Sequence, residues 1–137
     1  MKNALLFLLL NLAVVSKSFS SDYVVISNHN MKELSLSQIK AIFLKKLTIV
    51  DNIKVVPVNL GLRDEVRSKF EKKILKMNVT RLKSYWTKQH YLGHRPPVSM
   101  KSQESIKTFV KRVDGSLGYI MATSVDKDLK IIYKWSD

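Results

Sequence analysis

The sequence predicts an α/β protein with a mixed, mostly parallel sheet of about four strands flanked by helices. The first observation is the composition of four short runs, which are rich in apolar and β-branched residues and read as strands: 23–26, 54–58, 117–121 and 129–133. The second is that amphipathic stretches at helical spacing separate these runs, most clearly 36–46 and 65–76. Strands that alternate with helices favour a sheet covered on its faces by helices.

Residues 1–20 are predicted to be a signal peptide. A short positive start precedes an apolar run over 4–15, and small residues at Ser18 and Ser20 predict cleavage after Ser20. An apolar run of about twelve residues is too short for a stable membrane span, which needs about twenty. The alternative is an uncleaved anchor. We expect the remaining domain, 21–137, to be exported to the periplasm and not to be integral to the membrane.

The composition predicts one basic domain. The roughly 117 residues after the leader suffice for one hydrophobic core. Cysteine is absent, which excludes a disulfide framework and thiol chemistry. The net charge is +13, and removing the two lysines of the leader leaves +11. Such a charge attracts phosphate, nucleic acid or acidic lipid headgroups. The basic residues are scattered along several helices, so most of them are expected to form a solvated surface.

Each predicted helix has a recognisable start. Ser35 and Gln38 form a capping box for a first helix that should run to about Lys46. Asp64 is placed as the N-cap of the helix over 65–76. Two further helices follow the same pattern, the third capped by Asn78 or Thr80 and ended by Gly93, and the fourth capped by Ser102.

The turn over 59–64 is the candidate ligand site. It follows the second strand and leads into a helix, which is where α/β folds place ligands and where free N–H groups attract anions. The candidate donors are Asn59, Gly61, Arg63 and Arg67, since an arginine fork suits a tetrahedral oxyanion. Two alternatives stay open: the arginines are solvated or ion-paired surface residues, and Asp64 uses the helix start itself.

Ser27 and Asn28 end the first strand and complete the candidate set. They would face the same crevice if the first two strands were adjacent and parallel. Ordinary turn chemistry is the alternative explanation for both residues.

No metal, cofactor or enzymatic function is expected. His90 and His94 are four residues apart, but Gly93 interrupts the helix between them and no carboxylate lies nearby. Aromatic residues interleave with lysines around Trp86, a pattern that superficially suits single-stranded nucleic acid. Trp86 falls on the apolar face of its helix, so we expect it in the core. No catalytic motif is present.

Several segments, taken in order, resemble a known family: Leu36-Ser-Gln-Ile-Lys-Ala-Ile-Phe-Leu-Lys-Lys46, Val56-Pro-Val-Asn-Leu60, Tyr85-Trp86, Pro96-Pro97 and Gly115-Ser-Leu-Gly-Tyr-Ile120. Together they are similar to the short, single-lobe relatives of the phosphate-binding proteins that serve bacterial ABC importers. The resemblance extends from about residue 23 to residue 120. It implies a single lobe of the type 2 periplasmic-binding-protein-like fold.

In full-length members of that family, two lobes close on a phosphate, and an arginine before a Ser/Gly/Thr-rich turn meets the anion. The matching segment here departs from that pattern, because Asn59 stands where the arginine would be and most hydroxyls are missing. Arg67 and Phe70 do match a stretch that is common in the short relatives.

The resulting hypothesis is an exported, solute-binding-like protein that binds phosphate or a related oxyanion, with a link to phosphate ABC transport. Binding should be weak and salt-sensitive, since one lobe cannot bury its ligand. The first alternative is an interaction module for an envelope or transporter protein on the same fold. The second is a polyanion binder that acts through charge alone, with no specific nucleic acid.

Overall fold

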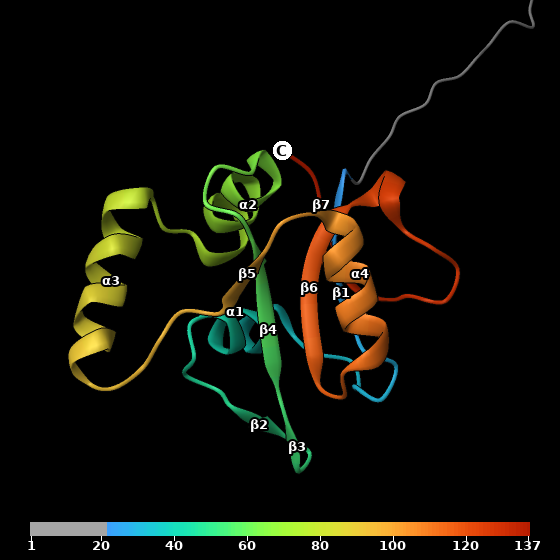
Figure 1. The fold of residues 1–137 in the computed structure, drawn as a ribbon, viewed down its shortest axis with the longest axis horizontal. Helices are drawn as coiled ribbons and strands as arrows, with labels where there is room; N and C mark the ends of the chain where they lie inside the picture. Colours follow the sequence, from blue (N-terminus) through green and yellow to red (C-terminus); the bar gives the residue numbers. More distant parts are fainter. Residues whose placement is uncertain (1–21) are drawn as a thin grey trace, which may run out of the picture.

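A computed structural model describes residues 22–137, so the predicted signal peptide lies outside the described residues. Figure 1 shows the arrangement of the elements. In chain order they are β1 (Tyr23–Ser27), α1 (Leu36–Phe43), β2 (Ile49–Val50), β3 (Ile53–Lys54), β4 (Val56–Leu60), α2 (Glu65–Phe70), η2 (Glu71–Leu75), α3 (Val79–Tyr91), β5 (Val98–Met100), α4 (Gln103–Arg112), β6 (Ser116–Met121), η3 (Ala122–Ser124) and β7 (Lys130–Trp135).

The main sheet has the strand order β5-β4-β6-β1-β7. β4 is parallel to both β5 and β6, whereas β1 is antiparallel to both β6 and β7. Four of the five strands therefore run in the same direction, which confirms the predicted mixed, mostly parallel sheet. The sequence did not predict β5, because three residues after a proline pair give too short a signal. β2 and β3 form a separate two-stranded hairpin.

The first two predicted strands, which correspond to β1 and β4, are neither adjacent nor parallel. The prediction that Ser27 and Asn28 face the same crevice as the turn after β4 is therefore wrong. β6 lies between β1 and β4. Ser27 pairs with Leu117, and Leu117 pairs with Pro57 near the beginning of β4. The end of β1 is therefore at the edge of the sheet where β4 begins. The turn after Leu60 is at the opposite edge.

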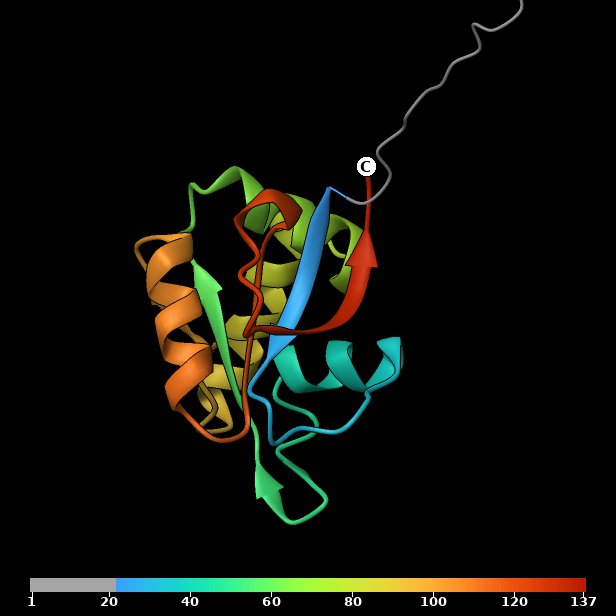
Figure 2. The ribbon, with the colours of Figure 1, turned by 90° about the vertical axis from the view of Figure 1, so that its right-hand side faces the viewer.

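Helices cover both faces of the sheet, with α4 on one face and α1 and α2 on the other (Figure 2). Gly118 of β6 marks the α4 face, since a Cβ there would lie 2.5 Å from Cγ2 of Ile106. Tyr119 points to the other face, where its ring stacks on Phe70 with 4.0 Å between centroids. Phe43 of α1 packs edge-on against Phe70 at 4.7 Å. This aromatic group fixes α1 and α2 against β6.

The predicted helix starts are confirmed. Ser35 and Gln38 form both bonds of the capping box. The other three helices are capped by Asp64, Asn78 and Ser102, each of which accepts a hydrogen bond from a backbone N–H in the first turn.

Two helix ends differ from the prediction. α1 ends at Phe43 because Lys45 has a left-handed φ of 63°. The helix predicted over 65–76 is α-helical only to Phe70 and continues as the π-helix η2. η2 buries Ile74 and Leu75, so it continues the apolar face that Val66 and Phe70 form on α2.

Trp86 is half-buried against the core, which it reaches from α3 together with Tyr85. Within residues 22–137, no helix has both the length and the apolar character that a membrane span requires.

Candidate functional site

Two strand ends lie side by side at one edge of the sheet. Leu60 of β4 is in register with Met100 of β5, and the two strands are parallel. The chain turns into α2 after β4 and into α4 after β5, so two helices begin at this edge. Asp64 Oδ1 accepts Val66 N–H at 2.8 Å and caps α2, as the sequence predicted. The surface beyond these strand ends is the candidate site.

Arg67 is the most constrained side chain at this edge, with only 8% of its surface exposed. Its Nε donates to Glu71 Oε2 at 2.8 Å, which forms an ion pair at i,i+4 spacing on the helix. Its Nη1 donates to the carbonyl oxygen of Leu60 at 2.9 Å and to Ser99 Oγ at 3.3 Å. The guanidinium therefore bridges the ends of β4 and β5. Nη2 takes part in none of these contacts and is the donor left for a ligand.

The turn before α2 is open to solvent. The Arg63 side chain is exposed and forms no ion pair or hydrogen bond within residues 22–137. Leu62 is 83% exposed. A Cβ added at Gly61 would meet nothing within 4 Å. Gly61 and Arg63 are thus reachable from solvent beside the buried Arg67.

Asn59 is not available in the way the sequence suggested. It is 6% exposed, and its Oδ1 accepts the hydroxyl hydrogen of Tyr119 at 2.8 Å. The Tyr119 oxygen in turn accepts Leu60 N–H at 3.1 Å. Burial raises the pKa of Tyr119 above its ordinary value, so the hydroxyl stays protonated and remains a donor at neutral pH. The Asn59 oxygen therefore already has a hydrogen-bond partner within the fold.

Ser27 and Asn28 lie at the opposite edge of the sheet and are not brought together with the turn at 59–64. Asn28 Nδ2 donates to the carbonyl oxygens of Val110 and Lys111, at 2.8 and 3.3 Å, near the end of α4. Its Oδ1 accepts Asn30 N–H at 3.0 Å. Both residues are buried. Asn28 thus closes the turn and caps the last carbonyls of α4.

Two residues at the site were missed by the sequence reasoning. Glu71 lies four residues after Arg67 on a predicted helix, and that spacing is the signal that could have found the ion pair. Ser99 carried no such signal, because it belongs to the unpredicted strand β5. Within residues 22–137 no three His, Cys, Asp or Glu side chains are grouped so as to hold a metal ion.

The fold is the predicted single lobe of the type 2 periplasmic-binding-protein-like fold, as a comparison with solved structures shows. No protein-family model and no curated protein matches the sequence. Two of the solved structures similar to it are phosphate transport proteins. An ABC-type phosphate transport receptor from Vibrio cholerae has a TM-score of 0.62 and 18% identity, covering 83% of this chain and 47% of that one. A putative phosphate ABC transporter substrate-binding protein with bound phosphate, from Clostridium perfringens, has a TM-score of 0.65 and 21% identity, covering 82% and 44%.

These likenesses confirm the predicted fold. The chain spans less than half the length of either transport protein. At such identities the comparison concerns the backbone, and the function must be argued from the residues of this chain.

Proposed function

We propose that this chain is an exported, solute-binding-like lobe that binds phosphate or a related oxyanion at the edge where β4 and β5 end. The observation that carries the proposal is the position of Arg67, whose guanidinium bridges Leu60 and Ser99 and keeps one nitrogen outside these contacts. A buried, pre-oriented arginine loses little side-chain entropy when it binds an anion, and its fork matches oxyanion geometry.

Arg63 is the second donor in this proposal. It is exposed and unpaired within the described chain, so it can turn toward an anion beside Arg67. Glu71 offsets the charge of Arg67 through the 2.8 Å ion pair, and the neighbouring Leu62 and Arg63 are exposed to solvent. We therefore expect affinity in the millimolar range that weakens as salt is added.

Calorimetric titration of residues 21–137 with phosphate and with sulfate tests this function. Arg63→Ala should weaken binding about tenfold, because one charge-assisted hydrogen bond contributes about 1.5 kcal/mol. Arg81→Ala is the matched control, since it removes an exposed arginine from α3 and should leave the affinity unchanged. Absence of heat at millimolar ligand, or an equal effect of both variants, would contradict the proposal.

A second candidate is an interaction module on the same fold without a small ligand. The internal contacts of Asn59, Asp64 and Arg67 favour it, since each of these side chains already has partners within the chain. In that case no oxyanion binds. Tagged protein should instead recover one envelope or transporter protein, reproducibly, from membrane extracts of its own cells. Loss of that recovery in Arg63→Ala would place the interaction at this edge.

Export is part of the same proposal. The leader over 1–20 supports it through its charge and apolar run. Expression of the full chain followed by N-terminal sequencing of the periplasmic fraction tests it. We expect a mature protein that begins at residue 21. Recovery of an unprocessed chain from the membrane fraction would favour an uncleaved anchor.

A further inference from the structure

Most of the net positive charge of residues 21–137 comes from one stretch that contains no acidic residue. From Lys72 to Gln103 the sequence contains no aspartate or glutamate, and it contains eight basic residues: Lys72, Lys73, Lys76, Arg81, Lys83, Lys88, Arg95 and Lys101. The stretch includes most of η2, all of α3 and the strand β5. Its charge of +8 is most of the +11 that remains without the leader.

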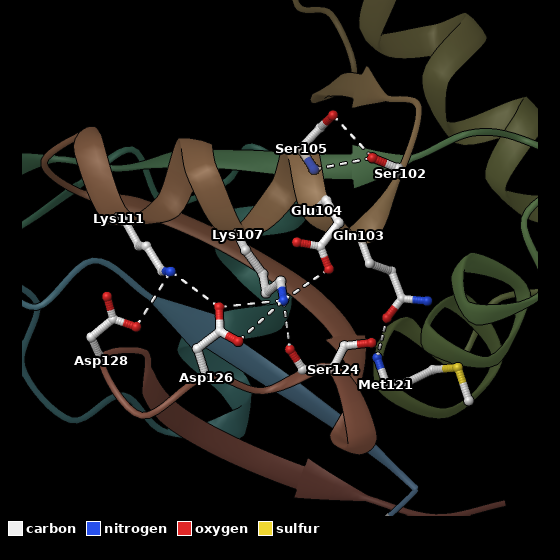
Figure 3. A network of polar contacts seen from close by, with 10 residues as sticks. All are labelled: Ser102, Gln103, Glu104, Ser105, Lys107, Lys111, Met121, Ser124, Asp126 and Asp128. Atoms are coloured by element: carbon white, nitrogen blue, oxygen red, sulfur yellow. Dashed lines mark hydrogen bonds and ion pairs between the residues drawn. The ribbon is translucent and has the colours of Figure 1, made fainter.

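Elsewhere several basic residues are paired with carboxylates, as the network at α4 illustrates (Figure 3). Lys107 Nζ lies 2.9 Å from Glu104 and 3.3 Å from Asp126, and it donates to the Ser124 carbonyl oxygen at 2.9 Å. Lys111 Nζ lies 3.0 Å from Asp126 and 3.3 Å from Asp128. These carboxylates leave the α4 side close to neutral.

The α3 side has no such compensation. Arg81, Lys83 and Lys88 are exposed, and they form no ion pair within residues 22–137. In Figure 1, α3 lies at the left end of the molecule, whereas α4 lies to the right of the centre beside β6. α3 is therefore an uncompensated basic element at one end of the molecule, and its charge favours the approach of an anionic partner from that end.

α3 presents a continuous outer face. Its inner face packs on the body through Leu82, which is buried, and through Tyr85, whose hydroxyl donates to the Leu44 carbonyl oxygen at 2.7 Å. The outer face is a shallow surface lined at helical spacing by Thr80, Lys83, Ser84, Thr87, Lys88 and Tyr91. A helix of 13 residues is about 20 Å long. Lys83 and Lys88 thus lie along one exposed face of a straight helix.

Exposed apolar side chains flank these lysines at both ends of α3. Val79 is 76% exposed at the beginning of α3, and Tyr91 and Leu92 are 84% and 62% exposed at its end. Isolated exposed apolar residues are common, but here they bracket a basic face. Tyrosine favours the headgroup level of a membrane, and lysine stems lie along apolar surface while the charge stays in water.

We infer that the outer face of α3 docks on an anionic phospholipid surface. A straight basic helix at one side of the body can meet a flat surface along its whole length, and each lysine near such a surface contributes to attraction. Single-stranded nucleic acid fits less well, because it needs several outward aromatic platforms, and Tyr91 is the one aromatic residue among those that line this face. Tyr85 and Trp86 instead turn toward the core.

The test is co-sedimentation of residues 21–137, which contain every described element, with vesicles of phosphatidylcholine and phosphatidylglycerol. We expect binding to vesicles that contain phosphatidylglycerol, little binding to pure phosphatidylcholine, and release on addition of salt. The double variant Lys83→Gln/Lys88→Gln should bind about 25-fold more weakly, at about fivefold per lysine. The matched control, Lys127→Gln/Lys134→Gln, removes the same charge from exposed lysines outside α3 and should change binding by less than about threefold.

Three outcomes would overturn the inference. Equal losses in the two double variants would show that net charge alone drives binding. Equal binding to both vesicle types would remove the role of anionic headgroups. Unchanged vesicle binding with reduced heparin binding in Lys83→Gln/Lys88→Gln would assign the face to a polyanion in solution. Folding of both variants is checked by circular dichroism, and their phosphate titrations should match that of the parent chain, since neither variant touches the edge at Arg67.

Discussion

Tyr119 donates its hydroxyl hydrogen to Asn59 Oδ1 over 2.8 Å, and the Tyr119 hydroxyl oxygen accepts Leu60 N–H at 3.1 Å. The phenol thus connects β6 to the last two residues of β4. Its ring stacks on Phe70 with an interplanar angle of 4°. The asparagine that stands where the resemblance would place a ligand-binding arginine therefore holds the end of β4 in place.

Tyr119→Phe should destabilise the protein by about 1–3 kcal/mol, because it leaves a buried N–H and a buried amide oxygen without their partner. Urea unfolding monitored by circular dichroism measures the change. Tyr133→Phe is the control, since that side chain is only half-buried and its hydroxyl forms no hydrogen bond within the described chain. A loss below about 0.5 kcal/mol for Tyr119→Phe would show that the bonds contribute little.

Arg67→Lys should also lower stability, by about 1–2 kcal/mol. A lysine ammonium cannot reproduce the planar fork that contacts Glu71, Leu60 and Ser99 at once. The same change at the exposed Arg63 should have no measurable effect on unfolding. If both substitutions were neutral, the bridge between β4 and β5 would not be a stabilising feature.

Gly115→Ala should destabilise by about 2 kcal/mol or more. Gly115 has a φ of +75°, which L side chains rarely adopt, and a Cβ there would collide with the carbonyl oxygen of Lys54. Gly61→Ala is the matched variant, because its Cβ would meet open space. Gly61→Ala should unfold at the same urea concentration as the parent chain. Anion binding can therefore be measured on this variant in its folded state.

The ion pairs around Asp126 predict a specific acid sensitivity. Hydrogen bonds from Lys111 and Lys107 lower the pKa of Asp126 below its ordinary value of 3.8. A lowered folded-state pKa contributes stability above the ordinary value, and that contribution is lost as the pH falls through the lowered one. Asp126→Asn should therefore be less stable than the parent at pH 7, and the difference should shrink below about pH 4.

Urea unfolding at pH 7, 4 and 3 measures this dependence. Asp114→Asn is the control, since Asp114 is exposed and forms no ion pair within the described residues. Parallel pH profiles for Asp126→Asn and the parent chain would show that the network does not stabilise the fold.

The sequence was sufficient where the signals are local. The caps at Ser35, Asp64 and Ser102 depend on residues within three positions, and the structure confirms each one. The order and direction of strands depend on pairings far apart in sequence. The placement of β6 between β1 and β4 separated Asn28 from the turn after β4, and nothing in the local sequence signals that insertion.

The candidate site shows the same limit. Arg67 was identified from its chemistry near the turn and from the resemblance, but its partners within the fold were not all identified. The partner Glu71 is local and could have been inferred. The bond from Arg67 to Ser99 and the bond from Tyr119 to Asn59 instead join residues 32 and 60 positions apart in the sequence. The local sequence therefore does not show which hydrogen-bond donors remain free for a ligand, because the tertiary contacts decide it.

The central claim is that an oxyanion binds at the edge formed by the ends of β4 and β5. The most direct measurement is an NMR titration of residues 21–137, labelled with ¹⁵N, against sodium phosphate at constant ionic strength. We predict saturable shifts at the backbone amides of Gly61, Leu62 and Arg63 and at the Arg67 side chain, with little change at α3. Shifts that stay linear with concentration, or that appear first at the lysines of α3, would contradict the claim.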